Sequence, residues 1–124
     1  MSQARVKAVE KRLVRIKSGI IETGSFLPGS ITEQYNVCGT NGCKCKDPAN
    51  PKKHGPYFQL GYYKNGKHTT SFIPKELAKH VKLEIANYKR VRKLMDNWIE
   101  LQLELAMLKI KIKKDEKAAM RKKA

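Results

Sequence analysis

The sequence predicts an α+β fold in which a cysteine-rich loop and a β-hairpin form a head, inserted into an antiparallel, coiled-coil-like helical hairpin. All three cysteines lie between residues 38 and 45, and a histidine follows at position 54. Asn65-Gly66 separates two β-type runs, and apolar residues recur at helical spacing on both sides of this region. We therefore expect three segments: an N-terminal amphipathic helix (1–24), a zinc-binding loop with a β-hairpin (25–73), and a long C-terminal helix with a basic tail (74–124).

Residues 3–22 are predicted to form the first helix. Its apolar residues step by three and four along one narrow stripe: Val6, Val9, Leu13, Ile16 and Ile20. A short helix with one thin apolar stripe is marginal alone, so it needs a partner helix. Gly24 and Pro28-Gly29 end it. The next residues, 30–35, are consistent with either a helical turn or an extended segment.

The segment from Val37 to Phe58 reads VCGTNGCKCKDPANPKKHGPYF. Three thiols and one imidazole, close in sequence and set among glycines, are the ligand set of a structural tetrahedral zinc site. We predict one zinc ion held by Cys38, Cys43, Cys45 and His54. The fourth ligand has three competitors, namely Asp47, His68 and His80, and the alternative to a metal site is three reduced thiols beside a surface histidine.

A β-hairpin is predicted from the runs 57–63 and 67–73, because Asn65-Gly66 is the strongest short hairpin signal. A two-residue turn places Lys64 opposite Lys67 and assigns one face to the core: Phe58, Leu60, Tyr62 and Ile73. The like-charged pair slightly destabilises a bare hairpin, and a phosphate between the two lysines would explain it.

A second helix is predicted from residue 75 to about 120, roughly 65–70 Å long, because no Gly or Pro follows Pro74. An acidic stripe at i+4 spacing, Asp96, Glu100 and Glu104, favours salt bridges with basic residues of the first helix folded back against it. Since this helix is the longer one, we expect an uncovered apolar seam that binds a second copy or another protein: Leu105, Leu108 and Ile112.

The chain carries 27 Lys and Arg against 11 Asp and Glu, a net charge of +16. Such a charge favours a polyanionic partner, and we expect nucleic acid rather than a membrane or a small-molecule substrate. The candidate contact residues lie in the loop, the hairpin and the tail: Lys44, Lys46, Lys52, Lys53, Tyr57, Tyr63, Lys64, Lys67, His68, Arg121 and Lys122.

The N-terminus has no apolar segment of a secretion signal, and no apolar run approaches a membrane span. With an odd number of cysteines, these features predict a cytoplasmic protein with reduced thiols. The chain has no nucleophile motif, phosphate loop or paired acids, and a zinc ion with four protein ligands has no open position. We therefore expect no enzymatic activity, with a redox role for Cys43 and Cys45 as the alternative.

The stretch GSITEQYNVCGTNGCKCKDPANPKKHGPYFQLGYY, continued by FIPKEL and NYKRVRKLMDNW, resembles a family of small prokaryotic cysteine-rich proteins of unknown function. The resemblance covers about residues 29–105 and implies that Cys38, Cys43, Cys45 and His54 occupy the family's metal-ligand positions. Some members are associated with transposases or other mobile elements. This implies a zinc-dependent DNA-binding accessory factor; an RNA-binding, ribosome-associated protein and a coiled-coil adaptor for a partner protein are the alternatives.

Overall fold

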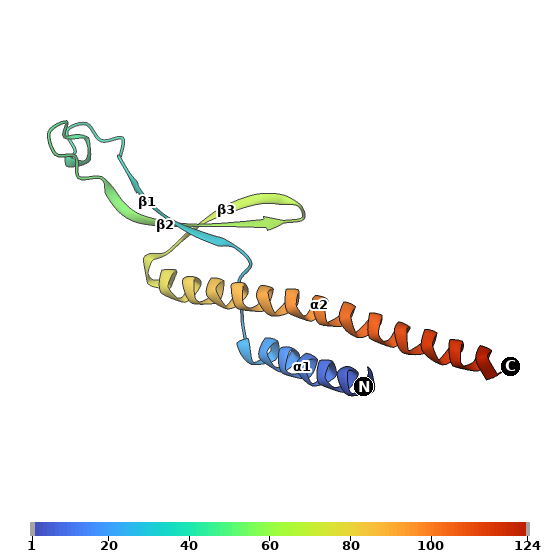
Figure 1. Ribbon diagram of the computed structural model, residues 1–124. Helices are drawn as coiled ribbons and strands as arrows, with labels where there is room; N and C mark the ends of the chain where they lie inside the picture. The colour runs from blue at the N-terminus through green and yellow to red at the C-terminus, as the bar shows by residue number, and fades with distance from the viewer. Residues whose placement is uncertain (1, 124) are drawn as a thin grey trace. The chain divides into compact units, whose positions relative to one another are not determined.

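The computed structural model describes residues 2–123 and contains two helices and one three-stranded antiparallel sheet (Figure 1). The elements follow in the order α1 (Ser2–Thr23), β1 (Ser30–Asn36), β2 (His54–Lys64), β3 (Lys67–Ile73) and α2 (Ala78–Lys123). Two single-turn 3₁₀ helices, Lys44–Lys46 and Lys75–Leu77, precede β2 and α2. The predicted α+β class is confirmed. Within the described part of the chain, no helix is both long and apolar enough to cross a membrane.

The chain divides into two compact units. The helical unit contains α1 and the part of α2 from Lys89 onward, and the sheet unit spans Ser25–Tyr88. The predicted segments 1–24, 25–73 and 74–124 followed the order of the elements, whereas packing assigns the first turns of α2 to the sheet unit.

The sheet has the order β1-β2-β3, and its hairpin has the register that Asn65-Gly66 predicts. Lys64 pairs with Lys67, and Phe58 pairs with Ile73. Asn65 and Gly66 have φ angles of 52° and 78°, the positive values that a two-residue hairpin turn requires at both positions.

One face of the sheet packs on the first turns of α2. Leu60, Val81 and Ile85 form a buried cluster. Four half-buried side chains pack around it: Leu27, Ile31, Tyr62 and Ile73. The core face predicted for the hairpin is therefore confirmed, and Phe58 is buried as well.

Residues 30–36, whose conformation the sequence left open, form the edge strand β1. Ile31 pairs with Leu60 and faces the core, so Thr32 and Gln34 lie on the open face with Gln59. There the side-chain Nε2 of Gln34 donates to Oε1 of Gln59 at 2.8 Å. An irregularity between Gln34 and Asn36 shifts the register and brings Asn36 opposite His54.

In the helical unit, α1 packs antiparallel against α2 around a buried cluster: Val6, Val9, Leu13, Leu101 and Leu105. The direction follows from two contacts. Arg5, near the start of α1, forms a 3.2 Å ion pair with Glu104, while Lys17, near its end, lies 5.4 Å from the ring centroid of Trp98. The acidic stripe therefore meets a basic residue of α1, as its spacing predicts.

The prediction of an uncovered seam at Leu105, Leu108 and Ile112 is wrong. Leu105 is 7% exposed, and Leu108 and Ile112 pack against the same cluster. The end of α1 meets the middle of α2, because a Cβ added to Gly19 would lie 3.3 Å from Leu94 Cδ1. From that point α1 runs along α2 as far as Ile112, so the expected seam is its partner surface.

Candidate metal centre

The loop between β1 and β2 begins and ends on paired residues. Asn36 and His54 are partners across the two strands. Cys38 is two residues beyond Asn36, so it lies close to His54, where the loop joins the two strands. A Cβ added to Gly55 would lie 2.7 Å from the carbonyl oxygen of Gln34, so a glycine at 55 lets the strands close directly beside the histidine.

A tight turn presents the other two cysteines. Gly42 has a φ of 79°, in the region that favours glycine, and the 3₁₀ helix Lys44–Lys46 follows Cys43. The amide of Lys46 donates to the carbonyl oxygen of Cys43 at 3.0 Å, and the amide of Lys52 donates to that of Lys44 at 3.0 Å. These hydrogen bonds hold Cys43 and Cys45 on one turn.

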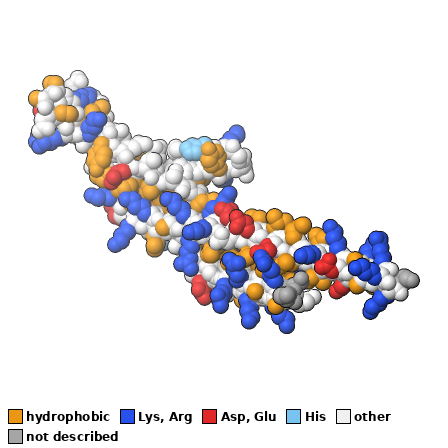
Figure 2. All heavy atoms as spheres, in the orientation of Figure 1, with side chains coloured by type: hydrophobic (Ala, Val, Ile, Leu, Met, Phe, Trp, Pro, Cys, Tyr) orange, Lys and Arg blue, Asp and Glu red, His pale blue; other side chains and the backbone are white. Residues whose placement is uncertain are grey.

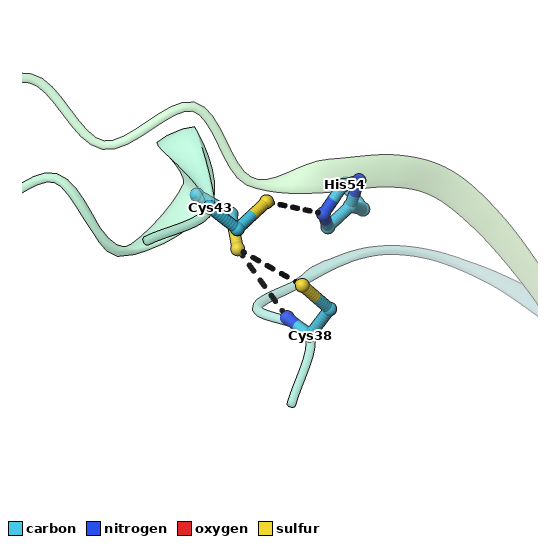
Figure 3. Close-up of side chains that lie close together, drawn as sticks. Cys38, Cys43 and His54 are labelled. Carbon is cyan, nitrogen blue, oxygen red and sulfur yellow. Dashed lines mark hydrogen bonds between the residues drawn. The ribbon is translucent and has the colours of Figure 1, made fainter. Parts of the chain in front are cut away.

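The donor atoms of Cys38, Cys43, Cys45 and His54 all lie within 4.8 Å of one another. The Sγ atoms of Cys38 and Cys45 are 3.7 Å apart. Cys43 Sγ lies 3.2 Å from His54 Nε2 (Figure 3). Tetrahedral zinc with Zn–S of about 2.3 Å and Zn–N of about 2.0 Å separates two sulfurs by about 3.8 Å, and sulfur from nitrogen by about 3.5 Å. The cluster can therefore hold a metal ion with small adjustments.

Burial also favours a metal as the organising element of the loop. Cys45 is 1% exposed, and it is the only buried residue between Val37 and Lys53, a segment that the structure describes in full. The flanking Val37 is largely exposed. A segment without an apolar core needs another source of order, and metal coordination supplies it in small domains.

The three competing ligands lie outside the cluster. Asp47 accepts the amide of Ala49 through Oδ1 at 3.0 Å, which closes a turn. His68 contacts the ring of Tyr63 edge-on, with ring centroids 5.1 Å apart. His80 Nε2 lies 3.7 Å from Glu84 Oε2 on α2.

The hydrogen bonds of the cluster prepare two of its thiols for metal binding. The backbone amide of Thr40, assisted by Cys43 and His54, lowers the pKa of Cys38 to about 6. The backbone amide of Cys45 lowers the pKa of Cys43. Thiolates are the metal-binding form of cysteine, so both shifts favour coordination.

The pKa values of the other two cluster residues, Cys45 and His54, are raised. The amide of Cys38 lowers the pKa of Cys45, but burial and the neighbouring thiolates outweigh it, so the net pKa is raised. The pKa of His54 is raised because its ring N–H bonds to Cys43 Sγ and Cys38 Sγ stabilise the charged imidazolium. A metal ion must therefore displace protons from Cys45 and His54.

These shifts predict how metal affinity depends on pH. The lowered pKa of Cys38 keeps its thiolate above about pH 6 and loses it as the pH falls through that value. Below about pH 6 one additional proton competes with the metal, so the fall in log affinity should steepen by about one unit per pH unit. Chelator competition at a series of pH values measures this slope; an unchanged slope across pH 6 would contradict the assignment of Cys38.

The structure places the candidate nucleic-acid contacts in three groups. Four exposed lysines lie within the loop that carries the cluster: Lys44, Lys46, Lys52 and Lys53. The hairpin tip carries Lys64, Lys67, Tyr63 and His68, all exposed, and Tyr63 and His68 share the open face with Tyr57. Arg121 and Lys122 lie in the last turn of α2, in the helical unit.

The sheet unit contains a hollow that sequence reasoning missed. Its volume is about 350 Å³, and its aromatic lining includes Tyr62, Tyr63, His68 and Tyr88. Tyr88 also stacks on Phe26, with ring centroids 6.0 Å apart. Tyr88 lies on the predicted long helix, and only the packing of the first turns of that helix on the sheet brings it to this hollow.

The fold and the cluster define a small basic α+β protein with a Cys₃His centre able to hold a metal. The family model "Domain of unknown function (DUF6788)" matches residues 3–83 of the 124. The chain belongs to this family. The match includes α1, the whole sheet and all four cluster residues, and it ends within the first turns of α2. Neither a curated protein nor a solved structure matches the chain.

Proposed function

We propose that the metal is one zinc ion with a structural role. Three sulfurs and one imidazole suit zinc, which accepts soft thiolates and imidazole in tetrahedral geometry. The chain supplies all four ligands, three from the loop and His54 from the start of β2, which leaves no coordination position for substrate or water. On this proposal the protein has no enzymatic activity through the metal, and coordination fixes the loop on the end of the sheet.

We propose that the metal-ordered sheet unit binds nucleic acid. The support is electrostatic: the chain has a net charge of +16, and four exposed lysines lie in the loop that the metal would order. The most specific support for nucleic-acid binding comes from the hairpin tip. Lys64 and Lys67 pair across the turn beside exposed Tyr63 and His68, an arrangement suited to one phosphate and an adjacent base.

DNA is the favoured partner, and the protein would act as an accessory factor of a mobile element. Its support is the resemblance to small cysteine-rich proteins found with transposases. RNA is the alternative, because exposed aromatic side chains on an open sheet face suit unpaired bases. The helix pair, which keeps three-and-four spacing of apolar residues, would serve as a coiled-coil-like hairpin carrying the basic tail with Arg121 and Lys122.

The double substitution Lys64→Ala and Lys67→Ala tests the hairpin contact. If both lysines contact phosphates of duplex DNA, the slope of log affinity against log salt should become shallower by about 1.8, or about 0.9 per contact. Fluorescence anisotropy of the zinc-loaded protein with labelled duplex DNA measures it. The matched control is Lys7→Ala with Lys11→Ala, which removes the same charge from α1. Equal changes in both variants would mean that net charge, not the tip, drives binding.

Crosslinking in the native cells identifies the partner. Recovery of DNA enriched at transposon ends supports the accessory-factor proposal. Enrichment of one RNA, above all ribosomal RNA, replaces DNA by RNA as the partner. Little crosslinked nucleic acid of either kind contradicts nucleic-acid binding and leaves protein partners as the explanation.

A further inference from the structure

A second apolar stripe lies on α2, apart from the surface that α1 covers. Its members follow one another at spacings of four and three, and all are exposed: Met95, Ile99, Leu103, Met107 and Ile110. Leu103, at the centre, is 63% exposed. Figure 2 shows apolar side chains gathered along the middle of α2. We refer to these five residues as the α2 stripe.

The α2 stripe faces away from α1. At about 100° per residue, its centre lies roughly 170° around the helix from the line of Leu101, Leu105 and Leu108 that packs on α1. A helix buries one apolar face against its neighbour and keeps the opposite face polar when it has no other partner. Two apolar faces on one helix indicate two packing partners, of which α1 is one.

We propose that the α2 stripe binds the same stripe of a second copy, in antiparallel orientation. Charge favours this occupant. Between Leu94 and Leu108 the helix carries three acidic residues, Asp96, Glu100 and Glu104, and no Lys or Arg. Elsewhere the chain is strongly basic, so this is the segment of α2 where two copies, each of charge +16, approach with the least repulsion.

The orientation follows from the charges beside the stripe. With Leu103 facing Leu103 of the second copy, Ile99 faces Met107. Asp96 then lies near Lys111 and Lys114 of that copy, so opposite charges meet on both sides of the centre. A parallel pair would place Asp96 and Glu100 of one chain beside Asp96 and Glu100 of the other, and lysines beside lysines. Like charges across a helix pair destabilise it, so the antiparallel pair is favoured.

Charge also limits the length of the contact. Beyond the stripe, Arg92 of one copy approaches Lys114 of the other, and Arg92 is only partly compensated by Asp96 at 3.8 Å. The stripe is about 24 Å long on a helix about 10 Å wide. Two such faces bury less than the roughly 1,200 Å² of a standard stable interface. We therefore expect a dimer that dissociates on dilution, with an affinity in the micromolar range.

Sedimentation equilibrium of the zinc-loaded full chain over a dilution series tests the dimer. The expected result is a reversible monomer–dimer equilibrium that Leu103→Glu weakens at least tenfold. Val14→Glu is the matched control, because Val14 is 62% exposed on α1 and lies outside the stripe; it should leave the equilibrium unchanged. A monomer at every concentration overturns the proposal, and so does a dimer equally affected by both variants or by neither.

A photo-crosslinking amino acid at Met95 tests the orientation without depending on the folding of a charged variant. In the antiparallel pair it should label the other copy close to Met107, Ile110 and Lys111, as mapped by mass spectrometry. Labelling close to Met95 of the other copy would indicate a parallel pair and overturn the proposed arrangement. Intermolecular labelling confined to residues outside α2 would overturn the interface itself.

Discussion

Replacing Cys45 with serine is expected to abolish stoichiometric metal binding and to remove the order of the loop between β1 and β2. A neutral hydroxyl is a poor replacement for a thiolate ligand of zinc. Cys45 is also the only buried side chain of the loop, so no apolar packing compensates. Structural zinc sites contribute about 10–16 kcal/mol of binding free energy, and this contribution is coupled to folding.

Metal analysis and hydrogen exchange measure the two parts of this prediction. The zinc content of Cys45→Ser should fall well below one ion per chain, and amides of residues 38–53 should lose protection. Amides of the buried α1–α2 contact, such as those of Val9 and Leu101, should keep theirs, because the helical unit has its own core. Asn50→Ser, an exposed change in the same loop, is the control. Full zinc occupancy in Cys45→Ser would remove Cys45 from the ligand set.

Replacing Leu105 with alanine is expected to destabilise the helical unit by about 2–4 kcal/mol, because the truncation leaves a cavity beside α1. Leu103→Ala, two residues away and exposed, should change stability by less than about 0.5 kcal/mol. Comparing the two substitutions therefore distinguishes the surface of α2 that α1 covers from the exposed α2 stripe.

Denaturant unfolding followed by tryptophan fluorescence measures this difference. The chain has one tryptophan, Trp98, and it packs against the Leu105 cluster, so its emission reports the helical unit. Protein concentration is kept below the range where copies associate, so that only the fold of one chain is measured. A larger effect of Leu103→Ala would reverse the assignment of the two faces.

Local signals in the sequence were sufficient for the hairpin and for the members of the cluster. Asn65-Gly66 determines the pairing of Lys64 with Lys67, because a two-residue turn leaves no freedom of register. The cysteines and His54 are close in sequence, and the loop joins two paired strands, so their meeting depends on few long-range contacts. The identity of the metal stays a prediction from the donor set.

The remaining features depend on contacts between distant segments. β1 was ambiguous because Glu33, opposite Phe58, interrupts the apolar alternation that marks a half-buried strand. The uncovered seam of α2 was placed wrongly because α2 has two apolar faces, and periodicity alone does not say which one α1 covers. The contact of Gly19 with Leu94 shows where α1 ends along α2. The residues next to Gly19 and Leu94 in the sequence do not predict that contact.

The lysine-free stretch of α2 has a consequence for how a polyanion lies on the protein. Phosphates would be attracted to the cationic turns up to Lys93 and again from Lys109 onward, whereas the stretch between them carries Asp96, Glu100 and Glu104 and no Lys or Arg. A bound strand would therefore show a protected footprint along α2 with a gap about 24 Å long. A polyanion and a second protein chain would then occupy separate parts of one helix without competing.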